Sequence, residues 1–222
     1  MSDAPTSESP ALWRARELLG AVAIPAWAGF HLWEQWSAFG GRAVFVDRMT
    51  STSHGPLALA AELLLGIAPV VAWLAIEARL LRAPEPAALK VAMADSPALA
   101  LRLGWIARVG SWVLFFFVLV HAVWIFAPKL IDGSEPLIAW LRLRDELGTW
   151  PLATVHAVGL TALAVHVWGA VPRAAILLGW GETPQARRAA RLSGGIVGVA
   201  LLILYAQLAG WHAAGTGTIW PI

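Results

Sequence analysis

The amino-acid sequence predicts an all-α integral membrane protein, a bundle of five transmembrane helices whose N-terminus lies in the cytoplasm. Three observations lead to this fold class. Of the 222 residues, 59% are hydrophobic and 14% are charged, and the mean hydropathy is +0.67, which is more apolar surface than one soluble core of this size can hide. The apolar residues form five long runs, and the basic residues gather in alternate intervals between these runs.

The composition also excludes several functional classes. Because the chain has no cysteine, it has no disulfide framework, no catalytic thiol and no cysteine ligands for an iron–sulfur cluster. A net charge of +2 spread over membrane loops argues against a nucleic-acid partner, although the pI is near 9.7. We divide the chain into a polar N-terminal tail, residues 1–12, and one transmembrane domain, residues 13–222, with no removable signal peptide.

Each apolar run is long enough to cross, or nearly cross, a bilayer core of about 30 Å as a helix. The five expected spans are residues 18–38, 56–81, 109–126, 152–178 and 193–211. The first ends among tryptophans, as is typical of a membrane interface, and Pro69 is expected to bend the second. The intervals 39–53 and 83–100 are interpreted as loops, and residues 181–191 as a charged turn.

The distribution of basic residues orients the bundle. With a cytoplasmic N-terminus, eleven of the sixteen basic residues lie on the cytoplasmic side. The five on the other side are Arg42, Arg48, Lys129, Arg142 and Arg144. This positive-inside bias places the N-terminus inside the cell and the C-terminus outside.

His121 lies in the nearly continuous apolar run of residues 108–124. An ionisable side chain inside a membrane is costly, so it indicates a functional site. His31 follows Arg16 by fifteen residues and His121 follows Arg108 by thirteen, which places both histidines roughly 20 Å from the inner boundary. Two neutral imidazoles at one depth on two helices can bind a haem iron between them, and without a Cys-x-x-Cys-His motif the haem is non-covalent, b-type.

The other histidines are interpreted differently. His166 lies in the inner half of the fourth span, where it can serve a second haem or form a polar contact. His156 lies ten residues earlier, about 15 Å along the axis, so the two cannot bind the same iron. We expect His156 to form a hydrogen bond within the helix bundle, and His54 and His212 to lie at the outer interface.

Taken together, these residues make the chain similar to the five-helix cytochrome b membrane anchor of succinate:quinone oxidoreductases, the type found in succinate dehydrogenases and fumarate reductases of menaquinone-using bacteria. The resemblance covers residues 16–191. It rests on the order and spacing of Phe30 and His31, Glu62 and Pro69, Arg108 and His121, and His166 followed by Trp180, Gly181, Thr183 and Pro184.

The resemblance implies that four histidines, one on each of the first four helices, hold two stacked haems. His31 and His121 match the pair for the distal haem, and His166 matches one ligand of the proximal haem. The position of its partner on the second helix is Trp73, whose indole nitrogen is a donor only and cannot ligate iron. We therefore expect one haem b, held by His31 and His121, while a second at His166 lacks its partner.

The resemblance further implies that the chain itself performs no chemistry on succinate or fumarate. It would anchor a flavoprotein subunit with FAD and an iron–sulfur subunit to the bacterial cytoplasmic membrane, and pass electrons to or from a quinone, menaquinone by analogy. The basic cytoplasmic loops offer these subunits a docking surface.

Several charged residues are candidates for binding the quinone or the haem. Glu62, inside the second span, can exchange a proton with a quinone or form a hydrogen bond between helices as a neutral acid. Glu34 is a weaker quinone candidate. Arg16 and Arg108, at the inner boundary, either pair with haem propionates or mark the membrane edge.

Two other functions are compatible with these residues. One is the b-type membrane subunit of a different respiratory enzyme, such as a nitrate reductase or a hydrogenase. The other is a haem-free structural anchor that keeps a quinone site beside the partner's cluster.

Overall fold

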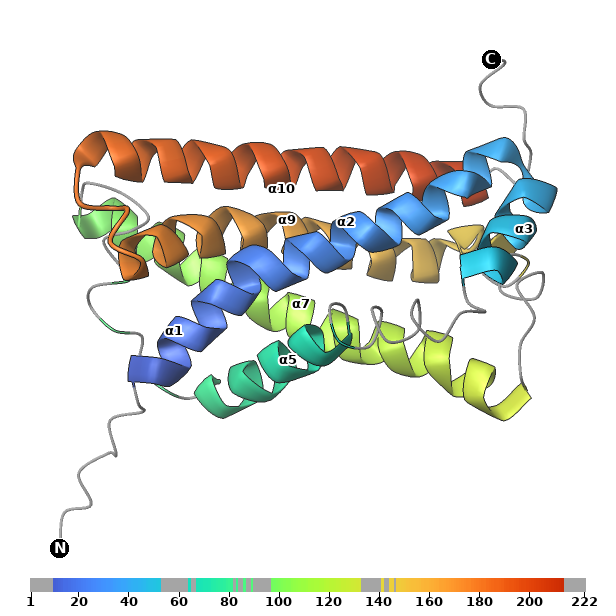
Figure 1. Cartoon of the computed structure of the whole chain (residues 1–222), viewed down its shortest axis with the longest axis horizontal. Helices are drawn as coiled ribbons and strands as arrows, with labels where there is room; N and C mark the ends of the chain where they lie inside the picture. The colour runs from blue at the N-terminus through green and yellow to red at the C-terminus, as the bar shows by residue number, and fades with distance from the viewer. Residues whose placement is uncertain are drawn as a thin grey trace, which may run out of the picture.

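The structure, a computed structural model, describes residues 10–52, 64, 67–81, 83, 86, 89, 97–132, 141, 144–145 and 147–213. All regular elements in these ranges are helices, and the long ones lie side by side along one axis (Figure 1). Three are long and apolar enough to cross a membrane, judged by length and composition: Ala98–His121, Trp150–Leu177 and Pro184–His212. The prediction of an all-α chain with membrane-spanning helices is confirmed at this level.

The expected first span is an irregular helix. It consists of α1 (Pro10–Leu18), a π-helical turn η1 (Leu19–Ala23), α2 (Ile24–Gln35) and a 3₁₀ turn η2 (Trp36–Gly40). Pro25, at the start of α2, has no N–H to donate to the preceding turn, which accounts for the irregular hydrogen bonding just before it. Helical backbone therefore covers all of the predicted span 18–38.

The interpretation of residues 39–53 as a loop is wrong, because residues Arg42–Thr52 form the helix α3. Gly41, at φ 90°, lets the chain turn sharply after η2. Phe45 is then buried to 2% exposure in a cluster with Leu32, Leu208 and Trp211. Glycines and charges in this interval suggested a loop, whereas burial of one aromatic side chain stabilises a short helix.

Of the expected second span, the structure describes the helix α5 (Ala68–Leu80). Pro69 lies in its first turn, where a missing N–H costs little. Glu62 and His54 lie outside the described residues.

The remaining helices are longer than the predicted spans. They are α7 (Pro97–Asp132), α9 (Trp150–Leu177) and α10 (Pro184–Ala213). Residues 97–100 of the expected loop therefore belong to α7, and most of the turn expected at 181–191 is helix. At their N-terminal ends, α7 and α10 continue beyond the predicted spans through segments that carry arginines, including Arg102 and Arg188.

A tight turn joins α9 to α10. Gly179, at φ 77°, ends α9, and the backbone N–H of Trp180 donates to the carbonyl of Ala175 at 2.8 Å, as in a Schellman motif. The hydroxyl oxygen of Thr183 then accepts from the N–H of Ala186 at 3.1 Å and caps α10, which begins at Pro184. This turn makes the two helices antiparallel neighbours.

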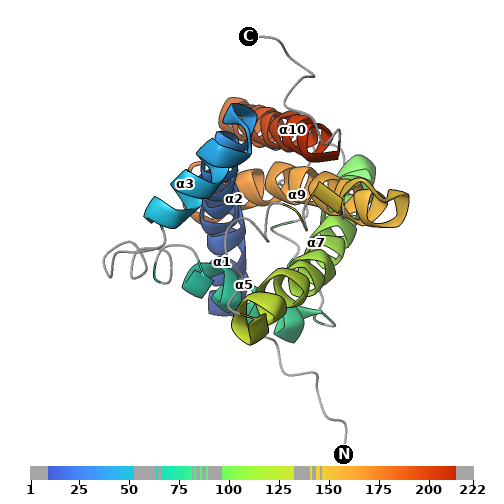
Figure 2. The ribbon, with the colours of Figure 1, turned by 90° about the vertical axis from the view of Figure 1, so that its right-hand side faces the viewer.

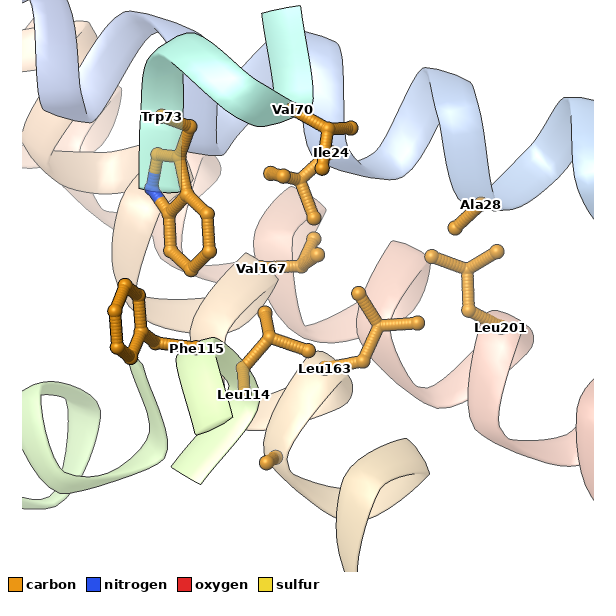
Figure 3. Packing of buried hydrophobic residues seen from close by; sticks show 10 residues of the cluster. Ile24, Ala28, Val70, Trp73, Leu114, Phe115, Leu163, Val167 and Leu201 are labelled. Atoms are coloured by element: carbon orange, nitrogen blue, oxygen red, sulfur yellow. The ribbon is translucent and has the colours of Figure 1, made fainter. Parts of the chain in front are cut away.

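The helix α9 is central, because it packs against both α7 and α10 (Figure 2). The main core cluster draws one or more side chains from each long helix, namely Ile24, Ala28, Val70, Trp73, Leu114, Phe115, Ala162, Leu163, Val167 and Leu201 (Figure 3). Large apolar side chains of α7 and α10 are exposed, among them Trp105, Val123 and Ile196. Such a surface suits lipid rather than water.

Two glycines allow α10 to approach α9 closely. A Cβ atom added to Gly198 would lie 2.6 Å from the carbonyl oxygen of Ala164, and one added to Gly194 would lie 3.1 Å from that of Trp168. Small residues at such contacts let membrane helices pack backbone to backbone.

We expect Gly198→Ala to destabilise the protein by about 1–3 kcal/mol, because the added methyl group forces the helices apart. Thermal unfolding in detergent would measure the loss. Gly210→Ala, on the same helix, is the matched control, since nothing lies within 4 Å of its added Cβ atom and helix propensity alone favours alanine. Equal effects of the two substitutions would contradict this account of the contact.

Candidate functional site

The two histidines predicted to share a haem lie next to each other. His31 on α2 and His121 on α7 have ring centroids 6.5 Å apart and planes 82° apart. Because a metal–nitrogen bond to histidine is about 2 Å long, two imidazoles on opposite sides of one iron have centroids roughly 6 Å apart. The observed distance fits such a pair, while the role of these histidines as ligands stays a prediction.

A third histidine lies in the same layer of the bundle. The His156 ring on α9 is 5.6 Å from that of His121. Phe117 packs against both, stacked on His121 at 5.4 Å and edge-on to His156 at 5.8 Å. The close approach of α7 and α9 at this level is possible because Gly159 faces the Phe117 ring, where a Cβ atom would lie 2.3 Å away.

The hydrogen bonding of His156 defines its tautomer. Its Nδ1 lies 2.9 Å from the carbonyl oxygen of Leu152, which only accepts, so Nδ1 carries the hydrogen and donates it. The other nitrogen, Nε2, is buried and has no hydrogen-bond partner among the described residues. The prediction that His156 forms a hydrogen bond within the bundle is confirmed, and its second nitrogen is left with a lone pair.

Glu34, predicted as a quinone candidate, lies beside His31. One carboxylate oxygen is 3.9 Å from Nδ1 of His31, and the two side chains are 12% and 37% exposed. The ring of Trp27 stacks on His31 with centroids 6.3 Å apart. His31 is thus more exposed than Glu34, whose carboxylate is its polar neighbour.

His166 lies deeper in the bundle, in a separate layer. The hydroxyl group of Ser111 donates to the carbonyl of Ala107 at 3.0 Å, so Nδ1–H of His166 donates to the Ser111 oxygen at 2.8 Å. The indole of Trp73 meets the imidazole edge to face, with centroids 5.0 Å apart. Nε2 faces Gly20, where a Cβ atom would lie 2.7 Å away. Protein groups therefore enclose His166 on the sides given by α5, α7 and η1.

Next to this layer, four charged side chains form a buried network. Arg16 donates to both carboxylate oxygens of Glu77, at 2.5 and 3.1 Å, and also pairs with Glu17. Arg173 lies 4.0 Å from Glu17 and donates to the carbonyl of Gly104 on α7 at 3.2 Å. All four side chains are at most 3% exposed, and their charges cancel.

The network gives a structural role to Arg16, which was predicted either to pair with a haem propionate or to mark the membrane edge. Two carboxylates, those of Glu17 and Glu77, lie against its guanidinium. Its guanidinium therefore stays charged and is held by carboxylates of the protein itself.

Arg108, the other predicted boundary arginine, binds backbone. Its Nη2 donates to the carbonyls of Leu80, Leu81 and Ala83 at 3.2, 3.1 and 2.7 Å. These carbonyls end α5, where the last turn of a helix lacks intrahelical partners. The structure thus uses Arg108 to join the end of α5 to α7.

Sequence reasoning assigned no role to Glu17, Glu77, Ser111 and Arg173, and it did not foresee the contact of His156 with His121. For Glu77 a signal was present, since it is an ionisable residue within an apolar run, the same signal that singled out Glu62. The described residues contain no group of three or more His, Asp or Glu side chains arranged to hold a bare metal ion. A haem iron needs at most two ligands from the protein, so this finding does not bear on haem binding.

Comparison of the chain with protein-family models, with curated proteins and with solved structures finds no match.

We expect Glu77→Gln to destabilise the protein by about 3–5 kcal/mol, because it removes one of the two carboxylates that pair with the buried Arg16. Unfolding in detergent would measure this loss. Asp145→Asn is the matched control: it breaks the exposed pair of Arg144 and Asp145, 2.8 Å apart, and such pairs contribute about 0–1 kcal/mol. A loss at Glu77 no larger than that at Asp145 would show that the network does not hold the helices together.

Proposed function

We propose that this chain is a b-type cytochrome, the membrane anchor and electron-transfer subunit of a succinate:quinone oxidoreductase. The observation that carries this proposal is the 6.5 Å distance between the rings of His31 and His121. Two helices that are distant in sequence bring two imidazoles to the spacing that an iron needs. The family resemblance supplies the identity of the complex.

The proposal includes a five-helix bundle with a cytoplasmic N-terminus. The helical run from Pro10 to Gly40 and the helix α5 supply the first and second spans beside the three long apolar helices. Exposed arginines lie on the elements that meet at the N-terminal end of the bundle (Figure 1). They are Arg14, Arg79, Arg102 and Arg188. This agrees with the positive-inside rule.

The same end is the proposed docking face for the iron–sulfur subunit, with the flavoprotein subunit and its FAD beyond it. Electrons would pass between that face and a membrane quinone, with a haem b as the intermediate carrier. When bound, haem supplies one-electron redox chemistry. His31 and His121 would hold it, and the aromatic rings of Trp27 and Phe117 stack on these two imidazoles.

For the quinone, Glu34 is the described candidate, since it lies next to His31 near the outer end of α2. Glu62 stays a candidate from its position in the sequence. Quinone type, menaquinone by analogy, and location in a bacterial cytoplasmic membrane belong to the same proposal.

A haem-free structural anchor is the second candidate, and one observation favours it. The indole of Trp73 packs against His166 at 5.0 Å, in the place where the family resemblance expects a second ligand. One of two haem positions is thus filled by protein, and a chain that had lost both would keep the same bundle.

We expect His121→Ala to abolish the low-spin haem b signal, because it removes one of the two axial nitrogens, whereas His156→Ala leaves that signal in place. Reduced-minus-oxidised absorption spectra of the purified complex would compare the two variants. A purified wild-type complex without a Soret band would establish the haem-free anchor, and the reverse pattern in the variants would overturn the ligand assignment.

We also expect one haem b per chain and not two, since Trp73, Ser111 and Gly20 surround the His166 ring. A pyridine haemochrome assay against protein concentration would give the ratio. A ratio of two would show that a haem displaces the Trp73 indole.

A further inference from the structure

We propose that His156 is an alternative axial ligand for an iron bound at His121, so that this iron has two possible partners, His31 and His156. The inference rests on the proposed function, since it requires a haem at His121. It assigns to the site a residue on α9 that the family resemblance does not include.

Distance is the first argument. The His156 ring lies 5.6 Å from the His121 ring, and the His31 ring lies 6.5 Å from it. Both values are close to the roughly 6 Å that two imidazoles on opposite sides of one iron require. Both pairs of ring planes also meet at 82°. Ring distance and interplanar angle therefore do not favour His31 over His156.

The hydrogen bonding of the two His156 ring nitrogens also suits this side chain to bind a metal. Metal-binding histidines almost always donate their other N–H to a carboxylate or a backbone carbonyl, which fixes the tautomer and orients the ring. His156 satisfies this condition, because its Nδ1–H donates to the Leu152 carbonyl at 2.9 Å. Its Nε2 carries the lone pair, is buried and has no partner among the described residues.

A buried acceptor without a hydrogen-bond partner is unfavourable, so Nε2 of His156 gains when a donor or a metal reaches it. His31 does not meet this condition through its carboxylate neighbour. Its polar neighbour, the Glu34 carboxylate, is 3.9 Å from Nδ1, beyond hydrogen-bond distance, and its side chain is 37% exposed. His31 can therefore leave an iron at a lower structural cost than a fully enclosed histidine, and His156 can replace it.

The test compares four proteins, each purified as the complex: wild type, His31→Ala, His156→Ala, and the double variant His31→Ala with His156→Ala. Absorption and electron paramagnetic resonance spectra report the spin state of the haem, and a pyridine haemochrome assay reports its amount. We expect both single variants to keep a low-spin haem at close to the wild-type ratio. The double variant should lose the low-spin signal, and added imidazole should restore it.

Each other outcome overturns the inference. If the wild type has low-spin haem but His31→Ala does not, His156 does not replace His31, and the proposed function stands. If the double variant stays low-spin, another group is the ligand. A wild-type complex without haem overturns both proposals. Should His31→Ala fail to purify as folded protein, His31→Gln, which keeps a polar side chain of similar length, makes the same comparison.

Discussion

Two arginines and two glutamates buried among apolar helices are tolerable only when each charge faces an opposite one, and this condition holds one end of the bundle together. Arg16 and Glu17 come from α1, Glu77 from α5 and Arg173 from α9, so one network joins three helices. The hydrogen bond from Arg173 to Gly104 adds α7. Because an unpaired charge at this depth would cost several kcal/mol, the helices have little freedom to slide past one another.

The fixed register of these helices also determines which histidines become neighbours further along the bundle. Once the parts of α1, α7 and α9 that form the network are aligned, the rise of each helix determines which side chains further along the bundle meet. His166 then meets Trp73 and Ser111 in one layer, and His31, His121 and His156 meet in another. An apolar layer that includes Leu114 and Leu163 belongs to the core cluster (Figure 3). The buried charged network at one end of the bundle therefore helps to position the histidines of the candidate site.

Part of the site was predictable because depth in a membrane can be counted from the sequence. His31 and His121 stand at similar distances from Arg16 and Arg108, and their rings are neighbours in the structure. Counting did not show which way a side chain points around its helix. For this reason the partners of Arg16 and Arg108 were not foreseen, and neither was the contact of His156 with His121. The helix α3 was missed because its stability depends on Phe45 reaching a distant cluster.

The sequence by itself determined the class of protein: long apolar runs make helices, and helices of that length and composition suit a bilayer, since backbone groups must be satisfied within each segment. It also showed which ionisable residues lie within or next to the apolar runs. Only the tertiary structure decided how these residues pair, because pairing depends on the rotation and register of helices that are far apart in the chain. Arg16 with Glu77, Trp73 with His166 and His156 with His121 are contacts of that kind, and no local pattern encodes them.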